Sequence, residues 1–142
     1  MRIWVLNGPN LGQLGRREPD VYGAATHDDL IRTVTAAGHQ LGAEVVVRQT
    51  DEEATMLAWL HAASAECDAV VLNPAAWTHT SVAVRDAAAT LTVPFVEVHL
   101  SNPLAREEFR HTSYTAGLAR GVIAGFGVES YVLALRALLA SS

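Results

Sequence analysis

Short apolar runs alternate along the chain with segments in which apolar residues recur every three or four positions. The runs predict buried strands, and the periodic segments predict amphipathic helices. Thr26 and Asp29 match a capping box at the start of the first helix, and Gly42 is a plausible stop after it. Strands are expected at Ile3–Leu6, Ala43–Val47, Ala69–Leu72, Val93–Val98 and Gly121–Phe126. Helices are expected from Thr26 to about Leu41, over Glu52–Ala65 and Val82–Leu91, and along a last stripe of Tyr131, Leu135, Leu138 and Leu139.

The order of these elements indicates an α/β fold. Continuous apolar strands separated by amphipathic helices are typical of a parallel sheet covered on both faces. Five strands fit the flavodoxin-like doubly wound arrangement, with strand order 2-1-3-4-5 and helices on both faces. The length of 142 residues suggests a single domain, residues 1–142. The loop at about residues 8–25 is long for a compact domain, which is typical of a lid or a binding loop.

Composition narrows the functional classes. Half of the residues are hydrophobic, which argues against disorder, and no apolar run approaches the roughly 20 residues of a membrane span. A net charge of −5 argues against nucleic-acid binding, which uses basic patches. Gly and Pro break the first residues, MRIWVLNGPN, too early for a signal peptide, so a cytoplasmic location is expected. The lone Cys67 precedes a predicted buried strand and is interpreted as a packed residue rather than a catalytic thiol.

The chain contains no lysine, and all ten of its basic residues are arginine. A lysine Schiff base is therefore impossible, which excludes pyridoxal phosphate enzymes and imine-forming aldolases or dehydratases. A Walker-type phosphate loop is excluded as well, because it needs its lysine. The remaining positive charges are guanidinium groups, which suit bidentate contacts to oxyanions.

Polar residues follow three of the predicted strands. The segments are Asn7–Asn10, Asn73–Ser81 and Glu97–Asn102, and Arg106 and Arg110 lie just beyond the last of them. Ligands of open α/β sheets bind outside the carboxyl ends of the strands. We therefore expect these amides, imidazoles, arginines and a carboxylate to line one crevice.

Simpler interpretations of the same residues stay open at this stage. Asn7 and Asn10 are also ordinary turn residues, and His79 also suits a helix cap. Glu97 and His99 alternate on one strand, so both are expected on one face, an arrangement more typical of a functional pair. A metal site made of His79, His99 and Glu97 matches no standard zinc spacing. Three further histidines fall in predicted helices and are interpreted as structural: His27, His39 and His61.

The long loop carries Arg17 and Tyr22. An isolated tyrosine has a pKa of about 10 and is a poor base at neutral pH. A guanidinium group within a few ångströms favours the tyrosinate, so the two residues on one mobile loop would form an activated base. A surface arginine beside a packing tyrosine fits the spacing equally well.

Five segments of the chain can be compared with known families: NGPNLGQLGRREPDVYG, VVVRQTDEE, VVLNPAAWTHTSVAVRDA, PFVEVHLSNPLAREEFRHTSY and GVIAGFGVESYVLAL. Taken together, they resemble the type II 3-dehydroquinate dehydratases over about Ile3–Leu139, and the first, third and fourth segments are specific in combination. The missing lysine agrees with this resemblance, because the unrelated type I enzymes react through a lysine imine.

The resemblance implies a lyase of the shikimate pathway, the route to chorismate and the aromatic amino acids. Its reaction is the trans dehydration of 3-dehydroquinate to 3-dehydroshikimate through an enolate. Tyr22 matches the family's base and Arg17 its activating arginine. Asn10, with a bound water, matches the group that stabilises the enolate. His99, oriented by Glu97, matches the acid that protonates the leaving hydroxyl.

The resemblance also implies how substrate binds and how subunits assemble. The substrate carboxylate would meet backbone N–H groups and a hydroxyl at Leu100 and Ser101. Asp86 would reach a neighbouring subunit's site in a homododecamer built from four trimers. No metal or organic cofactor, membrane or nucleic acid is implied. The residues implied to hold the substrate hydroxyls or border the site are Asn73, His79, Arg110 and Arg106.

The chain departs from the family pattern at Gly12, Thr50–Ala54, Trp77 and Thr112. None of these positions is assigned to bond making, so the departures concern loop packing and affinity. The main alternative is a non-catalytic flavodoxin-like module that binds a nucleotide or flavin. The glycines of this chain do not have the G-x-G-x-x-G spacing that such a module would use to bind phosphate. A hydrolase using Ser81 with His79 is another alternative, and no nucleophile-elbow motif surrounds this serine.

Overall fold

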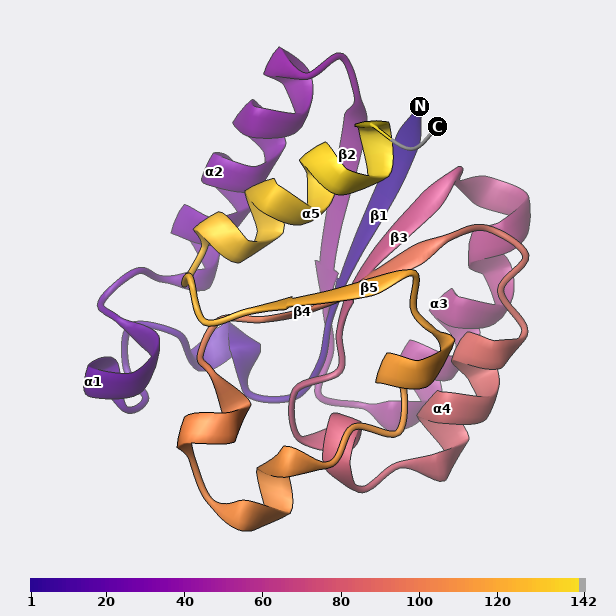
Figure 1. The fold of residues 1–142 in the computed structure, drawn as a ribbon. Helices are drawn as coiled ribbons and strands as arrows, with labels where there is room; N and C mark the ends of the chain where they lie inside the picture. The colour runs from indigo at the N-terminus through magenta and orange to yellow at the C-terminus, as the bar shows by residue number, and fades with distance from the viewer. Residues whose placement is uncertain (141–142) are drawn as a thin grey trace.

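Five parallel strands form one sheet in the computed structural model, which describes residues 1–140. The strand order is β2-β1-β3-β4-β5, so the predicted doubly wound topology is confirmed (Figure 1). Every neighbouring pair in the sheet is parallel. The strands are β1 (Arg2–Asn7), β2 (Glu44–Gln49), β3 (Ala69–Asn73), β4 (Phe95–His99) and β5 (Gly121–Ala124).

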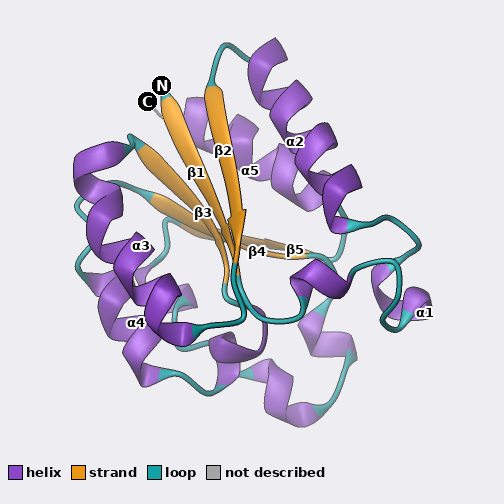
Figure 2. Cartoon of the chain, turned by 180° about the vertical axis from the view of Figure 1, so that it is seen from behind, coloured by secondary structure: helices purple, strands orange, loops and turns teal. Residues whose placement is uncertain are grey.

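Helices cover both faces of this sheet, as the sequence predicts. Figure 2 shows α2 and α5 on one face and α3 and α4 on the other. The long helices are α2 (His27–Gln40), α3 (Glu53–Glu66), α4 (Val82–Ala89) and α5 (Glu129–Ala140). Among the described residues, no helix is both long and apolar enough to span a membrane.

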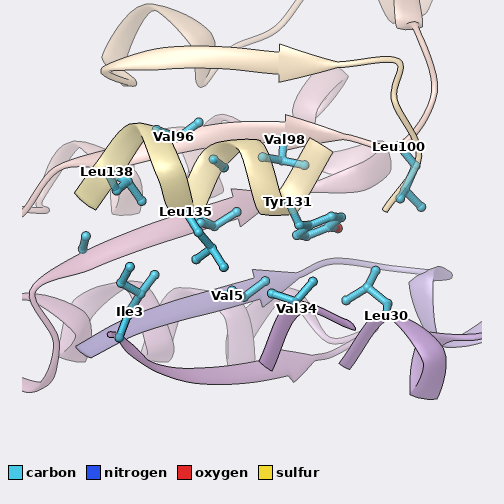
Figure 3. Packing of buried hydrophobic residues seen from close by; sticks show 14 of the residues in the cluster. Ile3, Val5, Leu30, Val34, Val96, Val98, Leu100, Tyr131, Leu135 and Leu138 are labelled. Carbon is cyan, nitrogen blue, oxygen red and sulfur yellow. The ribbon is translucent and has the colours of Figure 1, made fainter. Parts of the chain in front are cut away.

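The buried side chains of the strands divide between two cores. Along β1, Ile3 and Val5 pack toward α2 and α5, whereas Trp4 and Leu6 pack toward α3 and α4. This alternation follows from the two-residue period of a strand. Figure 3 shows the first core, where residues of α5 such as Leu135 lie between the helix and the strands. Because both faces are covered, most of the strand positions are apolar, which is why the strands appear as apolar runs in the sequence.

The predicted start and stop of the first helix are both confirmed. The Thr26 side chain accepts a hydrogen bond from the backbone of Asp29, and the Asp29 side chain accepts one from the backbone of Thr26. Gly42 has a φ of 83°, a left-handed conformation that suits glycine after a helix. Cys67 is buried beside the start of β3, so its interpretation as a packed residue is also confirmed.

Some element boundaries differ from the predicted ones. The second strand continues to Gln49 because it pairs in register with β1 as far as Asn7. The fifth strand ends at Ala124, because Gly125, with a φ of 96°, turns the chain away. The loop from 8 to 25 contains two short elements that the sequence did not predict. Short helical elements in the connections are α1 (Pro19–Tyr22) and the 3-10 turns Leu11–Gln13, Ala75–His79, Pro103–Ala105, Glu108–His111 and Ala116–Leu118.

Candidate active site

A cavity lies at the carboxyl ends of β1, β3 and β4, where the strand-end loops were predicted to meet. It encloses about 80 Å³, whereas one water molecule needs roughly 10–15 Å³. The cavity is therefore large enough for a small organic ligand. The predicted site residues that line it are Asn10, Arg17, Tyr22, Asn73, His79, His99, Leu100, Ser101, Arg106 and Arg110.

Gly8 holds the loop after β1 against the loop after β3. Its N–H donates a 2.8 Å hydrogen bond to the carbonyl oxygen of Asn73. A Cβ atom at this position would lie 2.5 Å from the carbonyl oxygen of Pro74, so no larger residue fits without moving the backbone. Asn7, considered above as a turn residue, is instead the fully buried last residue of β1.

Asn10 lines the cavity from a left-handed backbone conformation, with a φ of 68°. Asparagine tolerates this conformation better than most residues. The Asn10 N–H donates a 2.8 Å hydrogen bond to Oδ1 of Asp51, which follows β2. Oδ1 of Asp51 also accepts a hydrogen bond from Gln49, so the position of Asn10 depends on the loop after β2.

Tyr22 lies between two guanidinium groups. Nη1 of Arg106 donates a 2.8 Å hydrogen bond to the Tyr22 hydroxyl oxygen. The Cζ atoms of Arg17 and Arg106 lie 5.0 and 5.1 Å from the centroid of the Tyr22 ring, within cation–π distance. The sequence indicated Arg17 as the cation beside this tyrosine, and the structure adds Arg106 as the one that contacts the oxygen.

Glu18 connects the long loop to the segment that follows β4. Its Oε2 lies 3.7 Å from Nη2 of Arg17 and 3.6 Å from Nη2 of Arg106. The Glu18 side chain is about half exposed, and exposed ion pairs contribute only about 0–1 kcal/mol. This ion pair therefore contributes little to holding the loop in place.

His99 and Glu97 form a buried pair at the end of β4, on one face as predicted. Nε2 of His99 lies 2.8 Å from Oε2 of Glu97, so Nε2–H donates and Nδ1 is the free ring nitrogen. The Glu97 carboxylate also accepts hydrogen bonds from the hydroxyls of Ser113 and Thr115. Burial acts to raise the pKa of Glu97, but the hydrogen bonds from His99, Thr115 and Ser113 outweigh it and keep the pKa below its ordinary value. Glu97 is therefore a carboxylate at neutral pH.

His79 presents one defined ring nitrogen to a ligand. Its Nδ1 donates a 2.7 Å hydrogen bond to the carbonyl oxygen of Thr112. Burial lowers the pKa of His79, so the ring is neutral at pH 7 and Nε2 is a hydrogen-bond acceptor. The ring stacks near that of His99, with 6.4 Å between the centroids.

Of the remaining predicted residues, three line the cavity and one, Asp86, does not. Arg110 lines the cavity, and its Nε donates a 2.8 Å hydrogen bond to Glu107. Leu100 and Ser101 line the cavity where β4 ends. Asp86 does not line this chain's cavity; it is exposed on α4 and pairs with Arg85. Its expected role in a neighbouring subunit stays a prediction.

Sequence reasoning did not single out Glu18, Ser113 and Thr115. Glu18 and the two hydroxyls act through partners far along the chain, and nothing in their own spacing indicates those partners. Glu18 and Ser113 lie in segments that match the family, which was the one available signal for them, whereas Thr115 lies just after such a segment. Tyr131 was interpreted as part of an apolar helix stripe, yet its hydroxyl contacts two buried amides.

The arrangement combines a phenol beside a guanidinium with an imidazole beside a carboxylate, on the walls of one cavity. The first pair can accept a proton and the second can donate one, so the site is suited to acid–base elimination. In the part of the chain that the structure describes, no group of three or more His, Cys, Asp and Glu side chains is arranged to hold a metal ion.

Known proteins resemble this chain over nearly its whole length. The family model for Dehydroquinase class II matches residues 1–139. A 3-dehydroquinate dehydratase from Salinispora tropica is 59% identical over 140 residues, which cover 99% of this chain and 98% of the relative. The enzyme of the same name from Mycobacteroides abscessus is 55% identical over 142 residues, covering 100% and 99%. The crystal structure of type II dehydroquinase from Propionibacterium acnes superposes with a TM-score of 0.95 at 52% identity, covering 98% of this chain and 96% of that one.

Proposed function

The chain belongs to the class II dehydroquinase family and is a type II 3-dehydroquinate dehydratase of the shikimate pathway, and we propose that it eliminates water in trans through an enolate. The observation that carries this mechanism is the placement of Tyr22 and His99 on the walls of one cavity. The positively charged Arg106 contacts Tyr22, the proposed base, and the negatively charged Glu97 contacts His99, the proposed acid. The proposal assigns the proton removal to the tyrosine and the proton delivery to the histidine.

Tyr22 is the base that removes the proton from the carbon beside the ketone. The Arg106 guanidinium, hydrogen-bonded to the tyrosine oxygen, stabilises negative charge there, and Arg17 over the ring face adds a second positive charge. The electron pair of the broken C–H bond moves into the carbonyl group and forms the enolate. Because tyrosine is otherwise a weak base at neutral pH, both cations contribute to the reaction.

Asn10 stabilises the enolate oxygen, with a water molecule as intermediary. Its amide is a hydrogen-bond donor on the cavity wall, and preorganised donors at a developing charge are among the largest contributions to catalysis. The bond from its backbone N–H to Asp51 fixes the backbone from which this amide extends.

His99 protonates the hydroxyl that leaves. Because Nε2 is engaged by Glu97, the proton is delivered from Nδ1. The buried Glu97 carboxylate stabilises the imidazolium form and fixes the ring's orientation. When the enolate collapses, the C–O bond breaks and the hydroxyl leaves as water with this proton.

The other lining residues bind the substrate. His79, with Nε2 as an acceptor, and Asn73 hold substrate hydroxyl groups, and Arg110 supplies further donors. The substrate carboxylate binds at Leu100 and Ser101. The loop at 8–25 acts as a lid over this site, because it carries Arg17 and Tyr22 and is fastened by the exposed Glu18 contact.

The enzyme assembles as a dodecamer of four trimers, in which Asp86 completes a neighbouring site. This part of the proposal rests on the family resemblance and on the position of Asp86, exposed and away from its own cavity. The cytoplasmic location also stays a prediction; the buried free Cys67 is compatible with a reducing compartment.

The reaction is tested by mixing the protein with 3-dehydroquinate and following the ultraviolet absorbance of the conjugated product. We expect turnover across neutral to alkaline pH, and no signal in that range would contradict the activity. Borohydride added with substrate should leave the enzyme active, because the chain has no lysine to form an imine. Covalent trapping of substrate by borohydride would contradict the enolate route.

A further inference from the structure

A chain of four polar side chains runs from the start of α2 to the cavity wall; its first member, His27, is half-buried and the other three are buried. Nε2 of His27 lies 3.2 Å from Nδ2 of Asn7, and Oδ1 of Asn7 lies 2.7 Å from the Tyr131 hydroxyl. The same hydroxyl lies 2.8 Å from Nδ2 of Asn73, whose Oδ1 lies 3.1 Å from the backbone nitrogen of Ala75. Asn73 lines the cavity, and Figure 3 shows Tyr131 extending from α5 into the first core.

The direction of every hydrogen bond in this chain follows from its last link. The Ala75 N–H is a donor under all conditions, so the Asn73 atom that faces it is the carbonyl oxygen. The Asn73 amide nitrogen therefore faces Tyr131 and donates to it, and the Tyr131 proton goes to the next acceptor, Oδ1 of Asn7. Burial raises the pKa of Tyr131, so the hydroxyl keeps the proton that this arrangement requires.

The same logic extends to the far end of the chain. With its oxygen facing Tyr131, Asn7 presents its amide nitrogen to Nε2 of His27. That nitrogen must then be an acceptor, so His27 is neutral and carries its proton on Nδ1. Burial lowers the pKa of His27, in agreement with a neutral ring. A histidine interpreted as structural from sequence thus anchors a network that reaches the active site.

We propose that Tyr131 is a positioning residue for the dehydration: its hydroxyl accepts one N–H of the Asn73 amide, whose oxygen Ala75 holds, and so leaves a single N–H for a substrate hydroxyl. The proposal rests on the substrate-binding role of Asn73 given above. Without the Tyr131 oxygen, the Asn73 nitrogen would lose its buried acceptor. The amide would then be held only at its oxygen, by the Ala75 N–H, and its N–H groups would no longer have a fixed direction toward the cavity.

The backbone next to Asn73 gives the hydroxyl of Tyr131 a second effect on the cavity. Ala75 has a φ of 53°, a left-handed conformation that costs a residue with a Cβ atom free energy. The bond from its N–H to Asn73 Oδ1 holds this turn, and Ala75 and Ala76 both line the cavity. A phenylalanine would fill the same space in the core, so packing alone does not explain the hydroxyl at position 131.

A double-mutant cycle tests the proposal through kcat/KM for 3-dehydroquinate. Tyr131→Phe should lower kcat/KM about tenfold in the otherwise unchanged enzyme, the effect of losing roughly one hydrogen bond. In an Asn73→Ala background the same change should alter kcat/KM by less than about twofold, because its target is gone. Leu138→Ala, a buried control on the same helix, should lower the melting temperature and leave kcat/KM within about twofold of the parent.

The outcomes separate this proposal from the one on which it rests. If Asn73→Ala alone keeps full kcat/KM, the substrate-binding role of Asn73 is wrong. If Asn73→Ala is impaired but Tyr131→Phe is not, the role of Asn73 stands and the positioning role of Tyr131 is overturned. Equal losses from Tyr131→Phe in both backgrounds would also overturn it, because the hydroxyl would then act by another route.

The wild-type protein provides a second test, in which a variant serves only to assign the signals. Nitrogen-15 NMR of the histidine rings distinguishes a protonated Nδ1 from a protonated Nε2. We expect His27 in the Nδ1–H form at neutral pH, identified by the loss of its signals in His27→Gln. A protonated Nε2 would place the Asn7 oxygen against His27 and the Asn7 nitrogen against Tyr131. The Tyr131 proton would then lose its acceptor, which would overturn the network that holds this hydroxyl toward Asn73.

Discussion

The Arg106 guanidinium donates a 2.8 Å hydrogen bond to the hydroxyl of Tyr22, a residue 84 positions earlier in the chain. The contact joins the long loop after β1 to the segment after β4. Arg106 also lies 3.4 Å from the Ser101 hydroxyl, at the proposed carboxylate site. One arginine therefore touches both the proposed base and the proposed anchor of the substrate, so binding of the substrate and activation of the base are linked.

Removal of either guanidinium should slow the reaction. Arg106→Ala and Arg17→Ala should each lower kcat at pH 7 by at least about tenfold, because the negative charge on the Tyr22 oxygen loses a stabilising partner. Tyr22→Phe should lose roughly 10²–10⁴-fold, because no group remains to take the proton from the substrate.

The measurement is kcat at pH 7 for the wild type and the three variants. An arginine variant that keeps the kcat of the wild type would contradict charge stabilisation of Tyr22 by that residue. A Tyr22→Phe enzyme near full rate would show that another group is the base.

Acid sensitivity of the fold should depend on Glu97. Its pKa in the folded protein lies below the ordinary value of 4.5. Its carboxylate therefore stabilises the fold above about pH 4.5, and this contribution is lost as the pH falls from there through the lowered folded-state pKa. Glu97→Gln should reduce the free energy of unfolding at pH 7 and make it less dependent on pH below about 5.

Urea denaturation of both proteins between pH 3 and pH 7 measures this difference. Glu107→Gln is the control, because the pKa of this exposed carboxyl is also lowered, by its hydrogen bond to Arg110, yet solvent screens the interaction. Equal pH dependence in the wild type and Glu97→Gln would mean that the buried carboxylate is not the acid-sensitive group.

Much of this architecture could be predicted from the apolar pattern. The parallel sheet follows from alternating strands and helices, and five strands fit the observed order. The crevice follows from the polar segments after three strands. The ends of β2 and β5 could not be placed, because pairing to β1 and the turn at Gly125 determine them.

The residues that hydrogen-bond to the site residues from behind could not be predicted from the sequence for a related reason. Ser113 and Thr115 bond to Glu97 across a loop, and Tyr131 bonds to Asn7 across 124 positions. Residue type and local spacing carry no information about such partners. Tyr131 in particular has the helical spacing of a core residue and is one, so only its hydroxyl reveals the second role.

Gly8 should be required for the approach of two catalytic loops. In Gly8→Ala the new methyl group would meet the Pro74 carbonyl oxygen at 2.5 Å, and both sides of that contact are backbone. Overpacking of this kind typically costs about 1–3 kcal/mol. Thermal denaturation should show that loss together with reduced turnover. Gly117→Ala is the matched control, because a Cβ atom there meets nothing within 4 Å, and it should change neither property. A Gly8→Ala enzyme with wild-type stability and rate would show that the loops tolerate a wider separation.

Mixed assemblies should show whether Asp86 acts in a neighbouring subunit. Asp86 is exposed and absent from the lining of its own cavity, so the Asp86→Ala subunit keeps an intact Tyr22 and Arg106. Dissociating and reassembling Asp86→Ala with Tyr22→Phe should create sites that combine Tyr22 from one subunit with Asp86 from the other. The turnover of the mixture should therefore exceed the sum of the two variants measured separately. Tyr22→Phe mixed with Arg106→Ala should show no gain, because these two residues contact each other within one chain and every site lacks one of them. Absence of any gain in the first mixture, with reassembly verified by light scattering, would mean that Asp86 does not complete a neighbouring site.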